Sequence, residues 1–213
     1  MIVRDEGLTW LLITQPDHAQ LAADIVGAIR TEPALQSAAR DTLLLATREH
    51  DNGWTEVDAE PTIEPESGRP CDFMTGPANV KHELWLRGIT RLAKTDAHAG
   101  ALVAEHALTV YGYRSANPEW APFFDSITAM RDALLQRIGM FDEASRQAFE
   151  MNYRCIRLGD SFSLQFCNGW AASQTTLGIG RRVHARHYED DADLRAALAA
   201  AIPEVIAGAA RGA

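Results

Sequence analysis

The chain has few cysteines and no long apolar run. Its 213 residues include three cysteines, Cys71, Cys155 and Cys167, and no CxxC pair. A disulfide framework and a thiolate zinc site are therefore not indicated, and we expect reduced thiols that pack as small apolar side chains. No segment approaches the roughly 18 apolar residues of a membrane span, and the first thirty residues lack the pattern of a secretory signal. We expect a cytoplasmic protein with no membrane partner.

Positive charge is also scarce. Lys and Arg number 20 against 29 Asp and Glu, which gives a net charge of −9 at pH 7. Because binding to a phosphate backbone needs clustered Lys and Arg, we expect no nucleic-acid polymer as a partner. The phosphate-binding signature G-x-G-x-x-G and the nucleophile signature G-x-S-x-G are absent as well. A small-molecule substrate fits this composition best.

Hydrophobic residues make up 46% of the chain, and their spacing is mostly that of amphipathic helices. Helices are predicted at residues 15–29, 33–50, 79–92, 95–111, 123–138, 142–166 and 190–209. Short β elements are predicted near the N-terminus and near residues 175–188. The sequence therefore predicts an all-α, mainly helical bundle with small β additions.

We predict a single domain over residues 1–213. Residues 1–14 would form a β hairpin, residues 15–168 a helical core that carries the site, and residues 169–213 a hairpin plus a C-terminal helix. The Pro- and acid-containing segment 58–77 is predicted to be an irregular loop, long enough to suggest a functional lid. The Ala-rich C-terminal helix would suit a homodimer contact.

Several polar residues fall on apolar faces of the predicted helices. His18, His50 and His106 each recur with aliphatic residues at helical spacing, Asp51 follows His50, and Asp160 lies between Ile156 and Leu164. A buried carboxylate is costly unless it is paired or binds a cation. Inward-facing His and Asp side chains on neighbouring helices are how helical folds build metal sites. These ligand types predict one or two divalent transition-metal ions, Fe, Mn, Zn or Ni.

The order His18, then the pair His50-Asp51, then Asp160, resembles the H…HD…D signature of the HD-domain superfamily. The segments ITQPDHAQLA, REHDNGW and RLGDSFSLQFC more closely resemble a bacterial branch that is catalogued only as a domain of unknown function. The resemblance covers roughly residues 10–170. It implies an HD-like helical bundle and a metal-dependent phosphohydrolase.

The resemblance also implies roles for single residues. His18, His50, Asp51 and Asp160 would hold one metal, and Asp51 could bridge to a second ion and orient the attacking water. His106 would be a second-metal ligand or a general acid.

His82 lies in the interval where two-metal HD proteins place additional histidines, so it is a further candidate ligand. One departure is that no Lys follows the HD pair, which leaves the groups that would handle a phosphate unidentified. Trp54 and Trp10 could contact a substrate, and Arg154 is one candidate cation for a phosphate.

The leading hypothesis is a metal-dependent hydrolase that cleaves a phosphoester or nucleotide with a metal-activated water. The same superfamily includes diiron oxygenases with six His and Asp ligands, and His82 with His106 would complete six here. A non-catalytic sensor that binds a metal or a small molecule is the alternative from another class. The same side chains could also form a buried polar network without any metal.

Overall fold

The structure, a computed structural model, describes residues 1–29, 39–169, 172–176 and 182–186. The chain is mainly helical, with a small two-stranded antiparallel sheet near the N-terminus, as the sequence predicts. None of the described helices is long and apolar enough to cross a membrane. The elements are β1 (Ile2–Asp5), β2 (Trp10–Ile13), α1 (Gln15–Ala28), α2 (Ala39–Arg48), η2 (Asn52–Trp54), α3 (Thr55–Ala59), α4 (Ala78–Thr95), α5 (Ala97–Val110), η3 (Gly112–Arg114), η4 (Pro118–Trp120), α6 (Ala121–Arg137), α7 (Glu143–Asn168), β3 (Ala172–Thr176) and β4 (Arg182–Arg186).

Some boundaries differ from the prediction. The helix predicted at 33–50 is described from Ala39 and ends at Arg48, so His50 and Asp51 lie in the turn that follows it. The loop predicted to begin at Asp58 begins after Ala59, because Asp58 belongs to α3. The hairpin predicted at 175–188 has its paired strands at 172–176 and 182–186. Its turn, residues 30–38 and the helix predicted at 190–209 lie outside the described residues.

Local sequence signals account for where the helices begin and end. Thr14 caps α1 by accepting a hydrogen bond from the Asp17 amide, at 3.1 Å. Asp96 and Asp142 cap α5 and α7 through their carboxylates. Side-chain oxygens at these positions satisfy amide groups that have no partner within the helix. Gly169 ends α7 with φ of 65°, a left-handed conformation that favours glycine.

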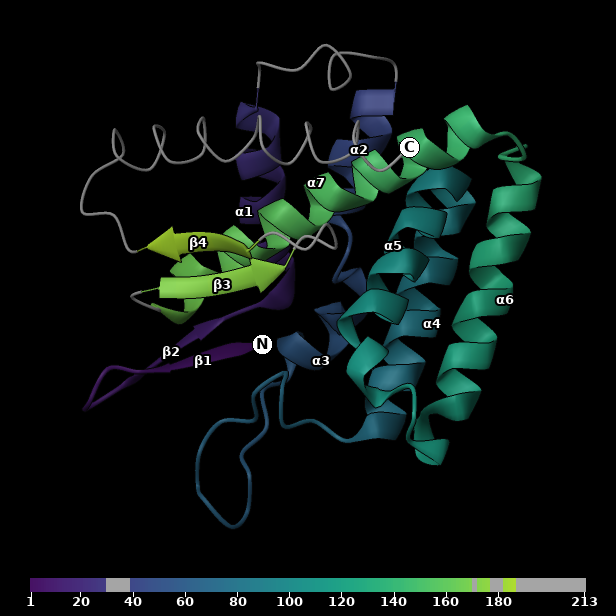
Figure 1. The fold of residues 1–213 in the computed structure, drawn as a ribbon. Coiled ribbons are helices and arrows are strands. Elements are labelled where there is room, and N and C mark those ends of the chain that lie inside the picture. Colours follow the sequence, from purple (N-terminus) through teal and green to yellow (C-terminus); the bar gives the residue numbers. More distant parts are fainter. Residues whose placement is uncertain (30–38, 170–171, 177–181, 187–213) are drawn as a thin grey trace.

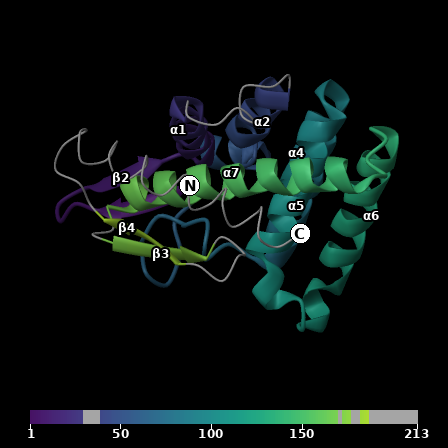
Figure 2. The ribbon, with the colours of Figure 1, turned by 45° about the horizontal axis from the view of Figure 1, so that its top comes forward.

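The longest helix in the part of the chain that the structure describes, α7, holds the two sides of the molecule together. It packs against α1 and α2 on one side and against α5 on the other. Figures 1 and 2 show it crossing these helices, while α4, α5 and α6 run side by side. Fully buried aliphatic side chains fill the contacts between these helices, among them Val26, Leu43, Ile89, Leu102 and Ile156. This packing places the midpoint of α7 at the centre of the core.

Glycines allow two of these contacts to be unusually close. A Cβ atom at Gly159 would lie 2.7 Å from the Ala22 carbonyl oxygen and 2.8 Å from a Val26 methyl carbon on α1. A Cβ atom at Gly53 would overlap the Leu84 carbonyl on α4. Gly159 precedes Asp160, and Gly53 follows Asp51 by two residues. The absence of a side chain at both positions therefore lets α7 carry Asp160 close to α1, and lets the turn after α2 carry Asp51 close to α4.

We expect Gly159→Ala to lower the free energy of unfolding by roughly 1–3 kcal/mol, the usual cost of forcing extra atoms into a packed core. Urea unfolding followed by circular dichroism would measure the change. Gly112→Ala is the control, since a Cβ atom there meets nothing within 4 Å, and we expect a change within about 0.5 kcal/mol. Equal stability of the two variants would contradict the close α1–α7 approach.

Candidate metal centre

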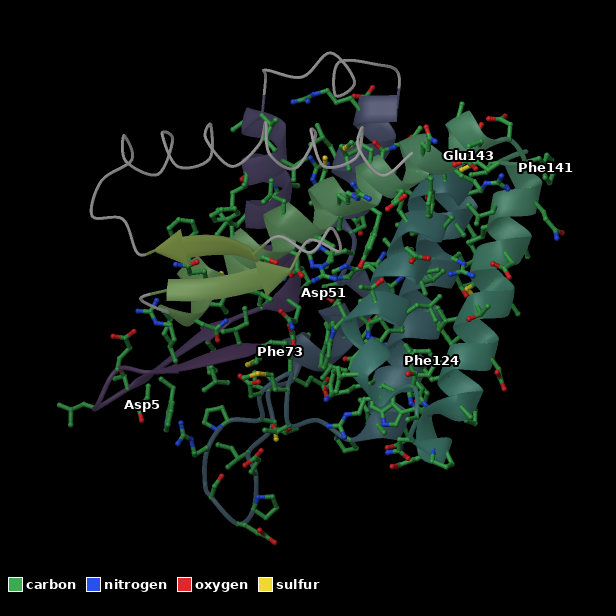
Figure 3. All side chains as sticks on the ribbon, viewed as in Figure 1. Asp5, Asp51, Phe73, Phe124, Phe141 and Glu143 are labelled. Atoms are coloured by element: carbon green, nitrogen blue, oxygen red, sulfur yellow. The ribbon has the colours of Figure 1, made fainter. Side chains whose placement is uncertain are left out.

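Five of the residues singled out from the sequence meet in the core. His18 comes from α1, His50 and Asp51 from the turn after α2, His106 from α5 and Asp160 from α7. Their exposed fractions are between 1% and 8%. Figure 3 shows Asp51 near the middle of the molecule. Within the described part of the chain they form two groups able to hold a metal ion, His18–His50–Asp51 and His50–His106–Asp160.

The atoms that face one another are nitrogen and oxygen atoms with lone pairs. The Nε2 atoms of His18 and His50 are 3.2 Å apart. The Asp51 Oδ2 atom lies 3.4 Å from each of them. The Asp160 Oδ1 atom lies 3.4 Å from His18 Nε2 and 3.6 Å from His50 Nε2. Both imidazoles and both carboxylates therefore converge on one point.

Hydrogen bonds behind the imidazoles decide which nitrogen of each ring carries the proton. His50 Nδ1 is 2.7 Å from the Thr47 carbonyl oxygen, which can only accept, so Nδ1 donates. Ser163 donates its hydroxyl proton to the Asp160 carbonyl at 2.9 Å, and its oxygen therefore accepts from His18 Nδ1 at 2.7 Å. Each neutral ring is left with a lone pair on Nε2. Such partners commonly orient metal-binding histidines.

This arrangement requires a cation between the four atoms. Two lone pairs 3.2 Å apart, with two carboxylate oxygens beside them, repel one another unless a proton or a metal ion lies between them. Ligands about 2.1 Å from one ion and about 90–109° apart around it lie about 3.0–3.4 Å from each other. The observed spacing of 3.2–3.6 Å is close to that range. The residues therefore fit a divalent metal ion in both chemistry and spacing.

The pKa values agree with a site that attracts cations. Burial alone lowers the pKa of the imidazoles, but the carboxylates of Asp51 and Asp160 outweigh it and raise the pKa of both His18 and His50. Burial alone raises the pKa of the two carboxyl groups, but the neighbouring histidines hold the pKa of each below its usual range. Both carboxylates are thus ionised at neutral pH, and their charge is available to a metal.

His106 occupies a separate place at the edge of this cluster. Its Nε2 atom is 3.8 Å from Asp160 Oδ2, the carboxylate oxygen that is turned away from His18 and His50. Burial lowers the pKa of His106 to about 4, so the ring is neutral at neutral pH. Its Nδ1 atom is buried and accepts or donates no hydrogen bond within the described residues. His106 is therefore placed to ligate a second ion or to accept a proton beside the first.

A cavity of about 60 Å³ opens beside the cluster. Four aromatic side chains, Trp54, Phe73, Trp85 and Tyr111, form part of its wall. Figure 3 shows Phe73 on the loop side of Asp51. The space is enough for an ion, a few water molecules and a small reacting group. The cluster is therefore open on one side, which suits a catalytic site better than a closed structural one.

Three predicted site residues lie elsewhere. His82 is stacked on Phe123 with ring centroids 5.1 Å apart, and it belongs to neither group of potential ligands. Trp10 is 37% exposed on β2, where it lies beneath the guanidinium group of Arg69. Arg154 is ion-paired with Glu150 one helical turn away.

Several residues of the site were not predicted, among them the cavity-lining Phe73, Trp85 and Tyr111 and the polar residues Gln15 and Ser163. Gln15 lines the cavity and is 2% exposed, and Ser163 orients His18. Gln15 is three residues before His18 on α1, so a polar residue one turn from an inward-facing histidine was the available signal. Ser163 follows Asp160 by three residues on α7, which was a similar signal.

We expect Ser163→Ala to weaken metal binding about 10–100-fold while the protein stays folded, because His18 loses the acceptor that fixes its ring. Competition with a fluorescent chelator would measure the affinity. Ser126→Ala, at an exposed position on α6, is the control and should bind metal like the wild type. Unchanged affinity in Ser163→Ala would show that this hydroxyl does not orient a ligand.

Comparisons with known proteins bear on the family of the chain. A family model described as a protein of unknown function, DUF3891, matches residues 1–197. No curated protein and no solved structure matches the chain significantly. The match agrees with the resemblance to a domain of unknown function seen in the sequence segments around the site. Since it spans most of the 213 residues, the chain belongs to the DUF3891 family of proteins of unknown function.

Proposed function

We propose that this protein is a metal-dependent hydrolase of the HD type. The observation that carries the proposal is the convergence of two imidazole lone pairs and two ionised carboxylates on one buried point beside an open cavity. The Nδ1 atoms of His18 and His50 are already hydrogen-bonded, so the Nε2 atoms and the two carboxylates are the groups left to bind a metal ion, in place of the protons that the raised pKa values of the two imidazoles would otherwise hold there. The proposal rests on this chemistry, together with the order of the His and Asp residues in the sequence.

His18, His50, Asp51 and Asp160 would hold the ion. A divalent metal in such a site supplies a water molecule of lowered pKa and draws electron density from a bound substrate. Asp51 is 3.4 Å from both imidazole nitrogens and borders the cavity, so its carboxylate also can accept a hydrogen bond from an attacking water.

His106 contributes as a neutral base or as a ligand. With a pKa of about 4, it carries no proton to donate at neutral pH, which disfavours the general-acid role that the sequence left open. Its Nε2 lone pair can accept a proton or bind a second ion beside Asp160.

The hydrolase is favoured over a diiron oxygenase by the number of ligands. An oxygenase of this type would use six His and Asp ligands, and the described residues bring five together because His82 lies against Phe123. A sensor without catalysis needs no open side on the metal, whereas the cavity provides one.

Removal of one carboxylate tests the ligand assignment. We expect Asp51→Asn to keep the fold and to retain less than about a tenth of the wild-type metal, because an amide is a weaker, uncharged ligand. Elemental analysis of protein purified without a His tag would measure it. Asp125→Asn, exposed on α6, is the matched control and should keep its metal. Wild-type metal content in Asp51→Asn would refute the assignment.

The reaction class is tested on the same metal-loaded protein. We expect hydrolysis of at least one member of a panel of phosphoesters, carboxylic esters and amides, with activity lost in Asp51→Asn. Oxygen consumption with iron-loaded protein would instead support the oxygenase. Metal binding without turnover of either kind would support the sensor.

A further inference from the structure

The walls around the proposed metal carry no positive charge. Within the described residues, neither a Lys nor an Arg side chain lines the cavity of about 60 Å³. The ammonium group of Lys81, one turn before Trp85 on α4, lies 6.0 Å from the ring centroid of Tyr111 behind the cavity wall and donates to the Met74 carbonyl at 2.8 Å. Arg87 and Arg91 donate to the carbonyls of Gly53 and Asn52 in the 3-10 turn. Sites that bind phosphate usually present Lys or Arg to its oxygens.

Uncharged hydrogen-bonding groups face the cavity instead. Gln15 lines the cavity and is only 2% exposed. Its side-chain oxygen has no hydrogen-bond partner among the described residues. The indole nitrogen of Trp85, which also lines the cavity, is buried and interacts with the Tyr111 side chain without forming a hydrogen bond of standard geometry. Leaving such groups unpaired is unfavourable, and a ligand with matching groups would recover that free energy. The Gln15 amide and the Trp85 indole N–H are thus available to a ligand beside the proposed metal.

A second cavity shares a wall residue with this site. Its volume is about 440 Å³, and Trp54 forms part of the wall of both cavities. Its described lining contains neither Lys nor Arg; Asp58 is paired there with the Met1 ammonium at 2.6 Å, which leaves the carboxylates of Glu64 and Asp72 without a balancing cation in the lining. A substrate that reached past Trp54 would meet these two carboxylates. An anionic extension is disfavoured there by charge repulsion.

We propose that the substrate presents an uncharged amide or ester group to the metal, and that Gln15 positions it by hydrogen bonding. This inference rests on the proposed hydrolase function and specifies its substrate class. In the reaction, the oxygen of water forms a bond to the carbonyl carbon while the bond to the amine or alcohol breaks. One proton of the water goes to the leaving nitrogen or oxygen, and the products are a carboxylic acid and an amine or alcohol.

The test compares two probes on metal-reconstituted full-length protein. Acetohydroxamic acid binds a metal through its carbonyl and N–O oxygens and carries an amide-like N–H beside them, whereas inorganic phosphate is an oxyanion with no N–H group. Because Trp54 and Trp85 line the site, tryptophan fluorescence reports both dissociation constants without any turnover. Hydrolysis of 4-nitrophenyl acetate and of 4-nitrophenyl phosphate is measured in parallel, since the two esters share a leaving group.

Gln15→Met removes the amide at nearly constant length. We expect it to weaken acetohydroxamic acid about tenfold, equivalent to about 1.4 kcal/mol, to change phosphate affinity less than about twofold, and to leave metal content intact. Gln20→Met makes the same change at an exposed position of α1, where the amide bonds Asp24, and should alter neither constant. In the wild type, the acetate ester should be cleaved with a higher kcat/KM than the phosphate ester.

The outcomes separate this inference from the function on which it rests. A protein that binds no metal overturns both. Preferential cleavage of the phosphate ester by the metal-loaded protein would overturn the substrate class and leave the hydrolase intact. The same conclusion would follow if Gln15→Met weakened the binding of both probes equally, or of neither.

Discussion

The mutual repulsion of four electron-rich atoms is the constraint on which this structure depends. The imidazole nitrogens of His18 and His50 and the carboxylates of Asp51 and Asp160 face one another across 3.2–3.6 Å inside a helical core. Buried charge of one sign is tolerated only with a counter-charge. The raised pKa of His50 and the lowered pKa of Asp160 express the same demand. A metal ion bound at this point, as we propose, would link α1, the post-α2 turn and α7.

The surrounding fold brings these atoms together by close backbone packing. Gly159 lets α7 approach α1 directly beside Asp160, and Gly53 lets the turn that carries Asp51 approach α4. Arg87 then ties that turn to α4 through the Gly53 carbonyl at 2.7 Å. Arg87 and Arg91 thus bond the backbone of the 3-10 turn, and no Lys or Arg side chain is among the described residues that line the cavity. This lack of positive charge underlies the proposed preference for an uncharged substrate group.

Helical periodicity was sufficient to predict most of the fold. Apolar spacing and capping residues such as Thr14, Asp96 and Asp142 mark helices within a few residues of where they are found, because both signals act over one or two turns. Burial of His18, His106 and Asp160 could also be predicted, since each shares a face with aliphatic residues. The position of His50 in a turn could not, because α2 ends at Arg48 and a local pattern locates a helix end only to within a few residues.

The sequence by itself determined which side chains turn inward, since a helix face follows from spacing of three and four residues. It also determined that the chain has fewer Lys and Arg residues, 20, than Asp and Glu residues, 29, so that few side chains can bring positive charge to a site. Only the tertiary structure decided which inward residues meet. His82 and His106 are both on helices, yet α5 carries His106 to Asp160 while α4 carries His82 to Phe123. The angle and rotation at which helices pack depend on contacts between residues far apart in sequence, and no local pattern encodes them.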